Sequence, residues 1–221
     1  MATEKEREIR QQLTKTGQRL VEKNLVAGPG GNISVRDGRW VYLSPSGFAL
    51  DEIKPEEWVK VDLVSGHYQG KWRPTCEISM HLGLYLARTD IRAIVHTHPA
   101  ITTGLVSGGI TLRPIFPDFV AILGHAIPVV DYVIPAGEAI RKAVVAALKR
   151  ANVATLKNHG AVCLGSTLYE AFVRSWVLEE SARMLLAALV AGKPRYLSAE
   201  EIEGIDHLEA EDYRKTLLKN R

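Results

Sequence analysis

Two histidines separated by one residue, His96 and His98, have a spacing suited to binding one metal ion. They end an apolar, β-branched segment, Ile91–Thr97, which predicts a buried strand that Pro99 terminates. Residues i and i+2 of a strand point to the same face, ~6.5–7 Å apart along the chain. The two imidazoles could therefore share a metal ion, although polar residues are also common where a strand ends.

A third histidine and a carboxylate extend this candidate site. His159 lies between two apolar segments, where the following Gly160 permits a sharp turn. Glu77 lies at the start of a predicted helix, where the N-terminal dipole favours a carboxylate. Singly, these residues are more simply explained as a turn histidine and a helix-favouring charge. Together with the histidine pair they would form a tetrahedral set of three nitrogens and one oxygen, suited to zinc or a similar divalent ion.

Two short glycine-containing segments predict loops that could bind an anion. They are Gly30-Gly31-Asn32 and Ser44-Pro45-Ser46-Gly47. Backbone N–H groups in such loops can converge on phosphate oxygens, as can the N-terminus of the helix expected to begin near Thr75. Each loop by itself is more simply an ordinary turn.

Composition restricts the classes of protein to which the chain can belong. Its 221 residues, 46% hydrophobic and 24% charged, are typical of a soluble globular protein. A formal net charge of +3 without a long run of like charges argues against nucleic-acid or membrane-surface binding. Two cysteines, Cys76 and Cys163, favour a reducing cytoplasm over a disulfide framework. The charged N-terminus lacks a signal-peptide core, and no apolar run is long enough for a membrane span.

The elements that must position these residues are strands interspersed irregularly with helices. Helices are expected over Thr3–Asn24, from a cap at Thr75 through Glu77 to Arg88, over Gly137–Arg150 and, after a Thr167/Glu170 capping box, as far as Gly192, with two short polar helices after Ser198. Strands are expected over Ile33–Arg36, Trp40–Leu43, Val59–Val64, the segment after Gly66, Ile91–Thr97, Ala126–Val130, Val153–Lys157 and Ala161–Leu164. This pattern favours a layered α/β fold with hairpins. No linker or repeat divides it, so one domain is expected over 1–221, with 193–221 as a C-terminal helical tail.

The order of the motifs resembles the class II aldolase/adducin-head family, and most of all its L-fuculose-1-phosphate aldolase-like members. The motifs that carry the resemblance, within about residues 5–192, are Gly31-Asn32-Ile33-Ser34, Ser44-Pro45-Ser46-Gly47, Thr75-Cys76-Glu77, His96-Thr97-His98-Pro99 and Asn158-His159-Gly160. The resemblance implies a three-layer α/β/α domain with a mixed, largely antiparallel central sheet. It also implies a homotetramer with active sites at subunit contacts.

Carried over position by position, the resemblance implies a role for each motif. His96, His98 and His159 would bind Zn²⁺, replaceable by Co²⁺ or Mn²⁺. Glu77 would be the catalytic acid/base, and a further metal ligand in the absence of substrate. The phosphate of the substrate would be held by Asn32, Ser46, Gly47, Thr75 and Cys76. The implied reaction cleaves a small ketose phosphate, such as L-fuculose 1-phosphate, to dihydroxyacetone phosphate and an aldehyde through a zinc-bound enediolate.

The sequence departs from the family pattern at three places. Cys76 stands where the aldolases usually have a second phosphate-binding serine. Glu77 stands where the epimerases have an aspartate, which favours carbon–carbon cleavage. The loop Arg113–Phe119 lacks the tyrosine that the aldolases contribute to an adjacent subunit, so Asp118 is its acid/base candidate. Tyr213 lies near the position of a second catalytic tyrosine of the family.

These departures keep other functions open. Within the family they are a sugar-acid phosphate decarboxylase, a dehydratase and a pentulose-phosphate 4-epimerase. A non-catalytic, adducin-like interaction domain is a remote alternative, because such a domain is expected to have lost the metal ligands. His81, four residues after Glu77, shares its helix face and would either orient the site or pack beside it.

Overall fold

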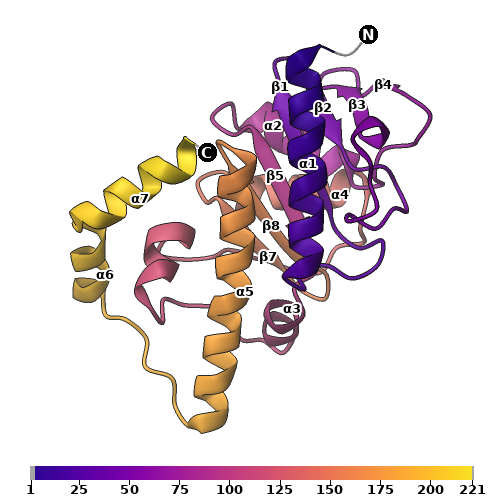
Figure 1. Cartoon of the computed structure of the whole chain (residues 1–221). Coiled ribbons are helices and arrows are strands. Elements are labelled where there is room, and N and C mark those ends of the chain that lie inside the picture. The colour runs from indigo at the N-terminus through magenta and orange to yellow at the C-terminus, as the bar shows by residue number, and fades with distance from the viewer. Residues whose placement is uncertain (1–2, 221) are drawn as a thin grey trace.

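The computed structural model describes residues 3–220, in which helices cover both faces of an eight-stranded sheet (Figure 1). The strand order is β4-β3-β2-β1-β5-β8-β7-β6, and within this part of the chain every neighbouring pair except β6 and β7 is antiparallel. The strands are β1 (Asn32–Asp37), β2 (Trp40–Leu43), β3 (Val59–Asp62), β4 (Tyr68–Gln69), β5 (Ala93–Thr97), β6 (Val129–Val130), β7 (Val153–Leu156) and β8 (Gly160–Gly165). The mixed, largely antiparallel sheet between helical layers confirms the predicted fold class.

The helices are α1 (Glu4–Glu22), α2 (Ile78–Ala87), α3 (Ala100–Ser107), α4 (Gly137–Ala147), α5 (Leu168–Ala191), α6 (Ala199–Asp206) and α7 (Glu209–Lys219). A 3₁₀ turn, η1 (Pro55–Glu57), and a π-helical turn, η2 (Phe119–Leu123), complete the described elements. Residues 1, 2 and 221 of the expected domain lie outside the described residues.

The alternation of side chains along β5 decides which layer each residue meets. Val95 packs into the hydrophobic cluster formed with α1 and α5, and Ile94 packs into the opposite cluster with α2 and α4. Thr97 shares the face of Val95, and its hydroxyl lies 3.0 Å from that of Ser175 on α5. His96 shares the other face with Ile94. His96 therefore points toward the layer that contains α2, where Glu77 directly precedes the helix.

Several local predictions are confirmed by the hydrogen bonds of the caps and turns. Thr3 caps α1, because its hydroxyl accepts a hydrogen bond from the N–H of Glu6 at 3.2 Å. The turn at Asp37-Gly38 joins β1 to β2, and Gly38 adopts the left-handed conformation, with φ 59°, that such hairpins favour. The α5 helix begins after Thr167, whose hydroxyl accepts the N–H of Glu170 at 3.1 Å.

Some expected boundaries and one expected cap were wrong. The helix predicted to run through Glu77 from a cap at Thr75 begins at Ile78, because the Thr75 hydroxyl accepts the N–H of Glu77 and leaves Glu77 as the N-cap residue. The strand expected over 126–130 contains only Val129–Val130. The capping box at the start of α5 is incomplete, since the Glu170 carboxylate accepts from the N–H and hydroxyl of Ser166.

Helix α3 was not predicted, and a distant residue supplies the cap at its N-terminus. The Glu179 carboxylate on α5 accepts hydrogen bonds from the backbone N–H groups of Ile101 and Thr102, at 3.0 and 2.9 Å, and from the Thr102 hydroxyl. Local sequence offers no cap here, because Pro99 precedes the helix. The contact also fixes the segment that directly follows His98.

Replacing Glu179 with alanine is expected to lower the free energy of unfolding by about 2–4 kcal/mol, because it leaves the buried N–H groups of α3 unpaired. Urea unfolding followed by circular dichroism measures this change. The neighbouring, half-exposed Glu180 gives the matched control, and Glu180→Ala should change the free energy by no more than about 0.5 kcal/mol. Equal losses in both variants would contradict the proposed cap.

The C-terminal tail forms two short helices, as predicted. Both α6 and α7 contact η2, and α7 also contacts α5, on the opposite side of α5 from α1 (Figure 1). In residues 3–220, no helix has the length and apolar character needed to cross a membrane.

Candidate metal centre

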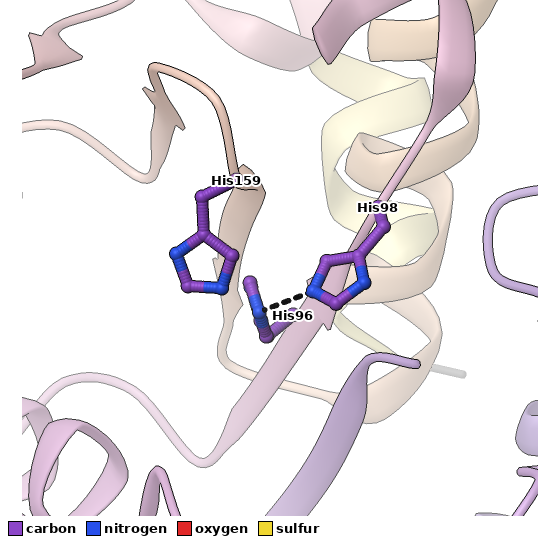
Figure 2. A group of neighbouring side chains, drawn as sticks. All are labelled: His96, His98 and His159. Carbon is purple, nitrogen blue, oxygen red and sulfur yellow. Dashed lines mark hydrogen bonds between the residues drawn. The ribbon is translucent and has the colours of Figure 1, made fainter. Parts of the chain in front are cut away.

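Three histidines converge at one end of the central strands (Figure 2). His96 lies in β5, His98 directly follows it, and His159 lies in the turn between β7 and β8. Because Thr97 of β5 pairs with Ala161 of β8, that turn is brought beside the end of β5. One nitrogen from each ring lies within 4.8 Å of the others, and the Nε2 atoms of His96 and His98 are 3.1 Å apart.

Glycines allow the backbone to approach these rings closely. A Cβ atom on Gly160 would lie 2.2 Å from the carbonyl oxygen of Thr97 and 2.8 Å from Cδ2 of His98, and one on Gly30 would lie 2.9 Å from Nδ1 of His98. Gly160 was expected to shape the turn, but the left-handed residue there is Asn158, with φ 54°. The glycines at 30 and 160 thus make room for His98.

Glu77 faces the histidine cluster from the neighbouring layer. Its Oε2 lies 3.1 Å from Nε2 of His96, and its Oε1 lies 3.5 Å from Nε2 of His159. The side-chain amide of Asn32 donates a hydrogen bond to Oε2 at 2.8 Å. Burial alone would raise the pKa of Glu77, but the charge of His96 and the hydrogen bonds from His96 and Asn32 hold that pKa well below its usual range. The carboxylate is therefore ionised at neutral pH.

The donor set fits a divalent cation. The Nδ1–H of His96 donates to the carbonyl oxygen of Ala161 at 2.9 Å, which directs the Nε2 atom of this ring at His98 and Glu77. Burial lowers the pKa of His98 to about 4, so the His98 ring is neutral at pH 7. Oε1 of Glu77 is buried without a hydrogen-bond partner among the described residues. Lone pairs this close together favour a bound cation, and imidazole and carboxylate groups suit zinc, cobalt and manganese.

One of the loops expected to bind phosphate, Ser44-Pro45-Ser46-Gly47, lies beside the segment 73–76 that directly precedes Glu77. The N–H of Ser46 donates to the carbonyl of Arg73 at 2.8 Å, and the N–H of Thr75 donates to the carbonyl of Ser44 at 2.9 Å. Those two backbone N–H groups are thus already bonded, so an anion here would have to be held by other groups. Gly47, Ser46 and Cys76 are exposed on these loops.

The two cysteines should differ sharply in their reaction with a thiol reagent. Cys76 is exposed, whereas Cys163 is fully buried in β8, and burial raises its pKa from 9.0 to about 12. Because the thiolate is the reacting form, we expect one thiol per native chain to react with Ellman's reagent, the second becoming available on unfolding. Cys76→Ser should abolish the native reaction, and Cys163→Ser should leave it unchanged. Two fast thiols in the native protein would contradict this prediction.

Asp118 and Tyr213 lie in a different part of the chain from the histidines. Asp118 precedes η2 and pairs with Arg214 of α7 at 2.9 Å, and both line an apolar cavity of about 460 Å³ between η2, α5 and α7. Tyr213 lies on α7 with 65% of its surface exposed. Neither residue belongs to the group of histidines and Glu77 that one chain brings together.

His81 contacts the candidate site through Asn32. Its Nε2 lies 2.6 Å from Oδ1 of Asn32, and burial lowers the pKa of the ring to about 3. Ser34 and Tyr85, for which no role was predicted, extend these contacts: the Ser34 hydroxyl bonds to Nδ1 of the ring, and the Tyr85 hydroxyl bonds to Ser34. Their spacing was the available signal: Ser34 follows Asn32 by two residues in a strand, and Tyr85 follows His81 by four in a helix.

The fold and the histidine cluster together define a candidate metal-dependent enzyme of the α/β class. The family model for the class II aldolase and adducin N-terminal domain matches residues 11–186. The chain belongs to this family.

Individual relatives agree on the family and differ in activity. An L-fuculose phosphate aldolase of Methanocaldococcus jannaschii is 37% identical over 187 residues, which cover 83% of this chain and 99% of that protein. A 3-oxo-tetronate 4-phosphate decarboxylase of Pectobacterium atrosepticum is 31% identical over 89% of this chain and 92% of that protein. The solved structure of an L-fuculose 1-phosphate aldolase, 30% identical, superposes with a TM-score of 0.85 over 97% of this chain and 98% of that one.

Proposed function

We propose that this protein is a divalent-metal-dependent lyase that cleaves a small ketose 1-phosphate, such as L-fuculose 1-phosphate, to dihydroxyacetone phosphate and an aldehyde. The observation that carries the proposal is the buried, ionised Glu77 carboxylate among three convergent imidazoles. The ion would be held by His96, His98 and His159, with Glu77 as a fourth ligand before substrate binds. Zn²⁺ is the expected ion, with Co²⁺ or Mn²⁺ as replacements.

In the cleavage direction the bond between C3 and C4 of the ketose breaks. The hydroxyl on C4 gives its proton to a base as the aldehyde forms, and Asp118 and Tyr213 are the candidates for that base. C3 gains a proton to complete dihydroxyacetone phosphate. When bound, the metal supplies Lewis-acid stabilisation of the negative charge that develops on substrate oxygens. Glu77, which is ionised before substrate binds, would first take up a proton, balancing the one released from the C4 hydroxyl, and would then deliver it to C3; in the synthetic direction its carboxylate removes the same proton.

Recognition of the phosphate is assigned to the loops beside Glu77. The side chains of Ser46, Thr75 and Cys76, with Gly47 and the amide of Asn32, are the groups that would meet it. Asn32 would contribute both to phosphate binding and to holding Glu77, because its amide also donates to the Glu77 carboxylate. A thiol is a weaker hydrogen-bond donor than a hydroxyl, so Cys76 would bind phosphate less strongly than serine does.

The active site would be completed between subunits of a cytoplasmic homotetramer. Asp118 is partly exposed and Tyr213 is largely exposed. Both lie on elements away from the histidines of their own chain. Their acid/base chemistry would therefore act on the substrate in an adjacent subunit. Light scattering that gives the mass of four chains supports this assembly, and a monomer at assay concentration contradicts it.

A panel of ketose 1-phosphates tests the proposed reaction. Release of dihydroxyacetone phosphate from L-fuculose 1-phosphate or a deoxypentulose 1-phosphate, lost with a chelator and restored by Zn²⁺, Co²⁺ or Mn²⁺, supports it. No release from any member, by protein that carries its metal, contradicts it.

A second candidate function is decarboxylation of a sugar-acid phosphate. It is favoured by the 31% identity to a 3-oxo-tetronate 4-phosphate decarboxylase and by the absence of tyrosine from the loop Arg113–Phe119. Carbon dioxide release from a 3-oxo sugar-acid phosphate would identify this activity. A product that retains every carbon atom would instead indicate an epimerase or a dehydratase.

A further inference from the structure

A buried chain of hydrogen bonds runs from α2 through β1 to the Glu77 carboxylate. The Tyr85 hydroxyl lies 2.9 Å from Oγ of Ser34, and that Oγ lies 2.7 Å from Nδ1 of His81. On the other side of the ring, Nε2 of His81 lies 2.6 Å from Oδ1 of Asn32, whose Nδ2 donates to Glu77 at 2.8 Å. All five side chains are buried, and three of them are completely inaccessible.

The chemistry of these groups allows one arrangement of protons along the inner part of the chain. Nδ2 of Asn32 donates to Oε2 of Glu77, so the amide nitrogen faces the carboxylate and the amide oxygen faces away from it. The Oδ1 of Asn32 then faces His81 and needs a donor, which places the ring proton on Nε2. Nδ1 of His81 is left as an acceptor, and the Ser34 hydroxyl donates to it.

We propose that His81 is a positioning residue for the Glu77 carboxylate, acting through Asn32. The Nε2–H of His81 holds the Asn32 amide in the orientation that presents Nδ2 to Oε2 of Glu77. Rotation of this amide by half a turn would place its oxygen against the carboxylate and the amide nitrogen against the His81 donor. The ring thus fixes the direction in which Glu77 faces the histidine cluster. This inference rests on the proposed function, because it assigns to His81 the orientation of Glu77, the group proposed to carry the proton.

The sheet and helix place these residues so that the chain of bonds is rigid. Asn32 pairs directly with His96 in the register of β1 and β5, so the amide and a candidate metal ligand share one rung of the sheet. Ser34 lies two residues further along the same face of β1. His81 and Tyr85 are one helical turn apart on α2 and both point at this face.

Two substitutions at one position separate positioning from packing. In His81→Gln, the side-chain nitrogen is the same number of bonds from Cβ as Nε2, so a donor to Asn32 is retained. In His81→Asn, the side-chain oxygen corresponds to Nδ1, so only the acceptor for Ser34 is retained. We expect His81→Asn to lower kcat by ~10–100-fold with KM within about twofold, and His81→Gln to remain within about threefold of the wild type.

Measurements that do not depend on turnover accompany the kinetics. Nitrogen-15 NMR of the metal-free wild type should show the His81 ring protonated at Nε2 and unprotonated at Nδ1. Because Glu77 is also a ligand of the substrate-free site, cobalt titration should give a ~10–100-fold weaker affinity for His81→Asn than for His81→Gln.

A proton on Nδ1, equal effects of the two substitutions, or a change confined to KM would overturn the positioning role. If the wild type binds cobalt but cleaves no sugar phosphate, the proposed reaction fails while the tautomer and the two cobalt affinities still decide the role of His81. The two failures are therefore distinguishable.

Discussion

His96→Ala is expected to remove the divalent ion from the purified protein and to lower kcat/KM by ~10³-fold or more, because it deletes the central ligand of the site. His96 is fully buried, lies 3.1 Å from both Nε2 of His98 and Oε2 of Glu77, and is held by the carbonyl of Ala161. Neither His98 nor His159 lies this close to both another histidine of the site and Glu77. We expect about one ion per wild-type chain, and elemental analysis after dialysis measures this number.

His67→Ala is the matched control, because this histidine is exposed and lies in the turn before β4. It should keep both the metal and the activity. Circular dichroism establishes that each variant is folded before the metal is counted. A folded His96→Ala protein with wild-type metal content would contradict the site, and wild-type protein unable to bind zinc, cobalt or manganese would contradict the mechanism.

Glu77→Gln is expected to lower kcat by ~10²–10⁴-fold, the usual contribution of general acid/base catalysis, while the protein stays folded. Glutamine has nearly the size of glutamate and can still accept the hydrogen bond from Asn32, but it cannot take a proton from carbon. At saturating metal, the variant should fail to exchange the C3 proton of dihydroxyacetone phosphate with deuterium from the solvent. The wild type should exchange this proton without an aldehyde being present.

The exposed Glu8 on α1 offers a control for the loss of one negative charge. Glu8→Gln should exchange and cleave at the wild-type rate. Exchange at the wild-type rate in Glu77→Gln would assign the proton transfer to another group, and Asp118 and Tyr213 would then be the residues to substitute next.

The elements that could be predicted from the sequence are those with local signals. Thr3 and Thr167 begin their helices by hydrogen bonds within one turn, and the Asp37-Gly38 turn defines its hairpin within four residues. Helix α3 has no such signal, because its cap comes from Glu179, 77 and 78 residues away in the sequence from the N–H groups it binds. Its start could only be recognised once α5 was in place.

The same distinction applies to the site. The spacing of His96 and His98 places both on one face of a strand wherever that strand lies. The identity of that face, toward α2, follows from the packing of Val95 and Thr97 against the opposite layer. The hydrogen bonds to Glu77 follow from the register that pairs Asn32 with His96.

The sequence by itself determined the order of the motifs, the family they resemble and the types of ligand at the candidate metal centre. These properties depend on residue identity and on periods of two or 3.6 residues, which act along the chain. Only the tertiary structure decided that Asn32 and His81 hold Glu77, that Gly30 and Gly160 make room for His98, and that Asp118 and Tyr213 lie away from the histidines of their own chain. The physical reason is that those contacts join strands and helices distant in sequence, so they exist only when the layers pack.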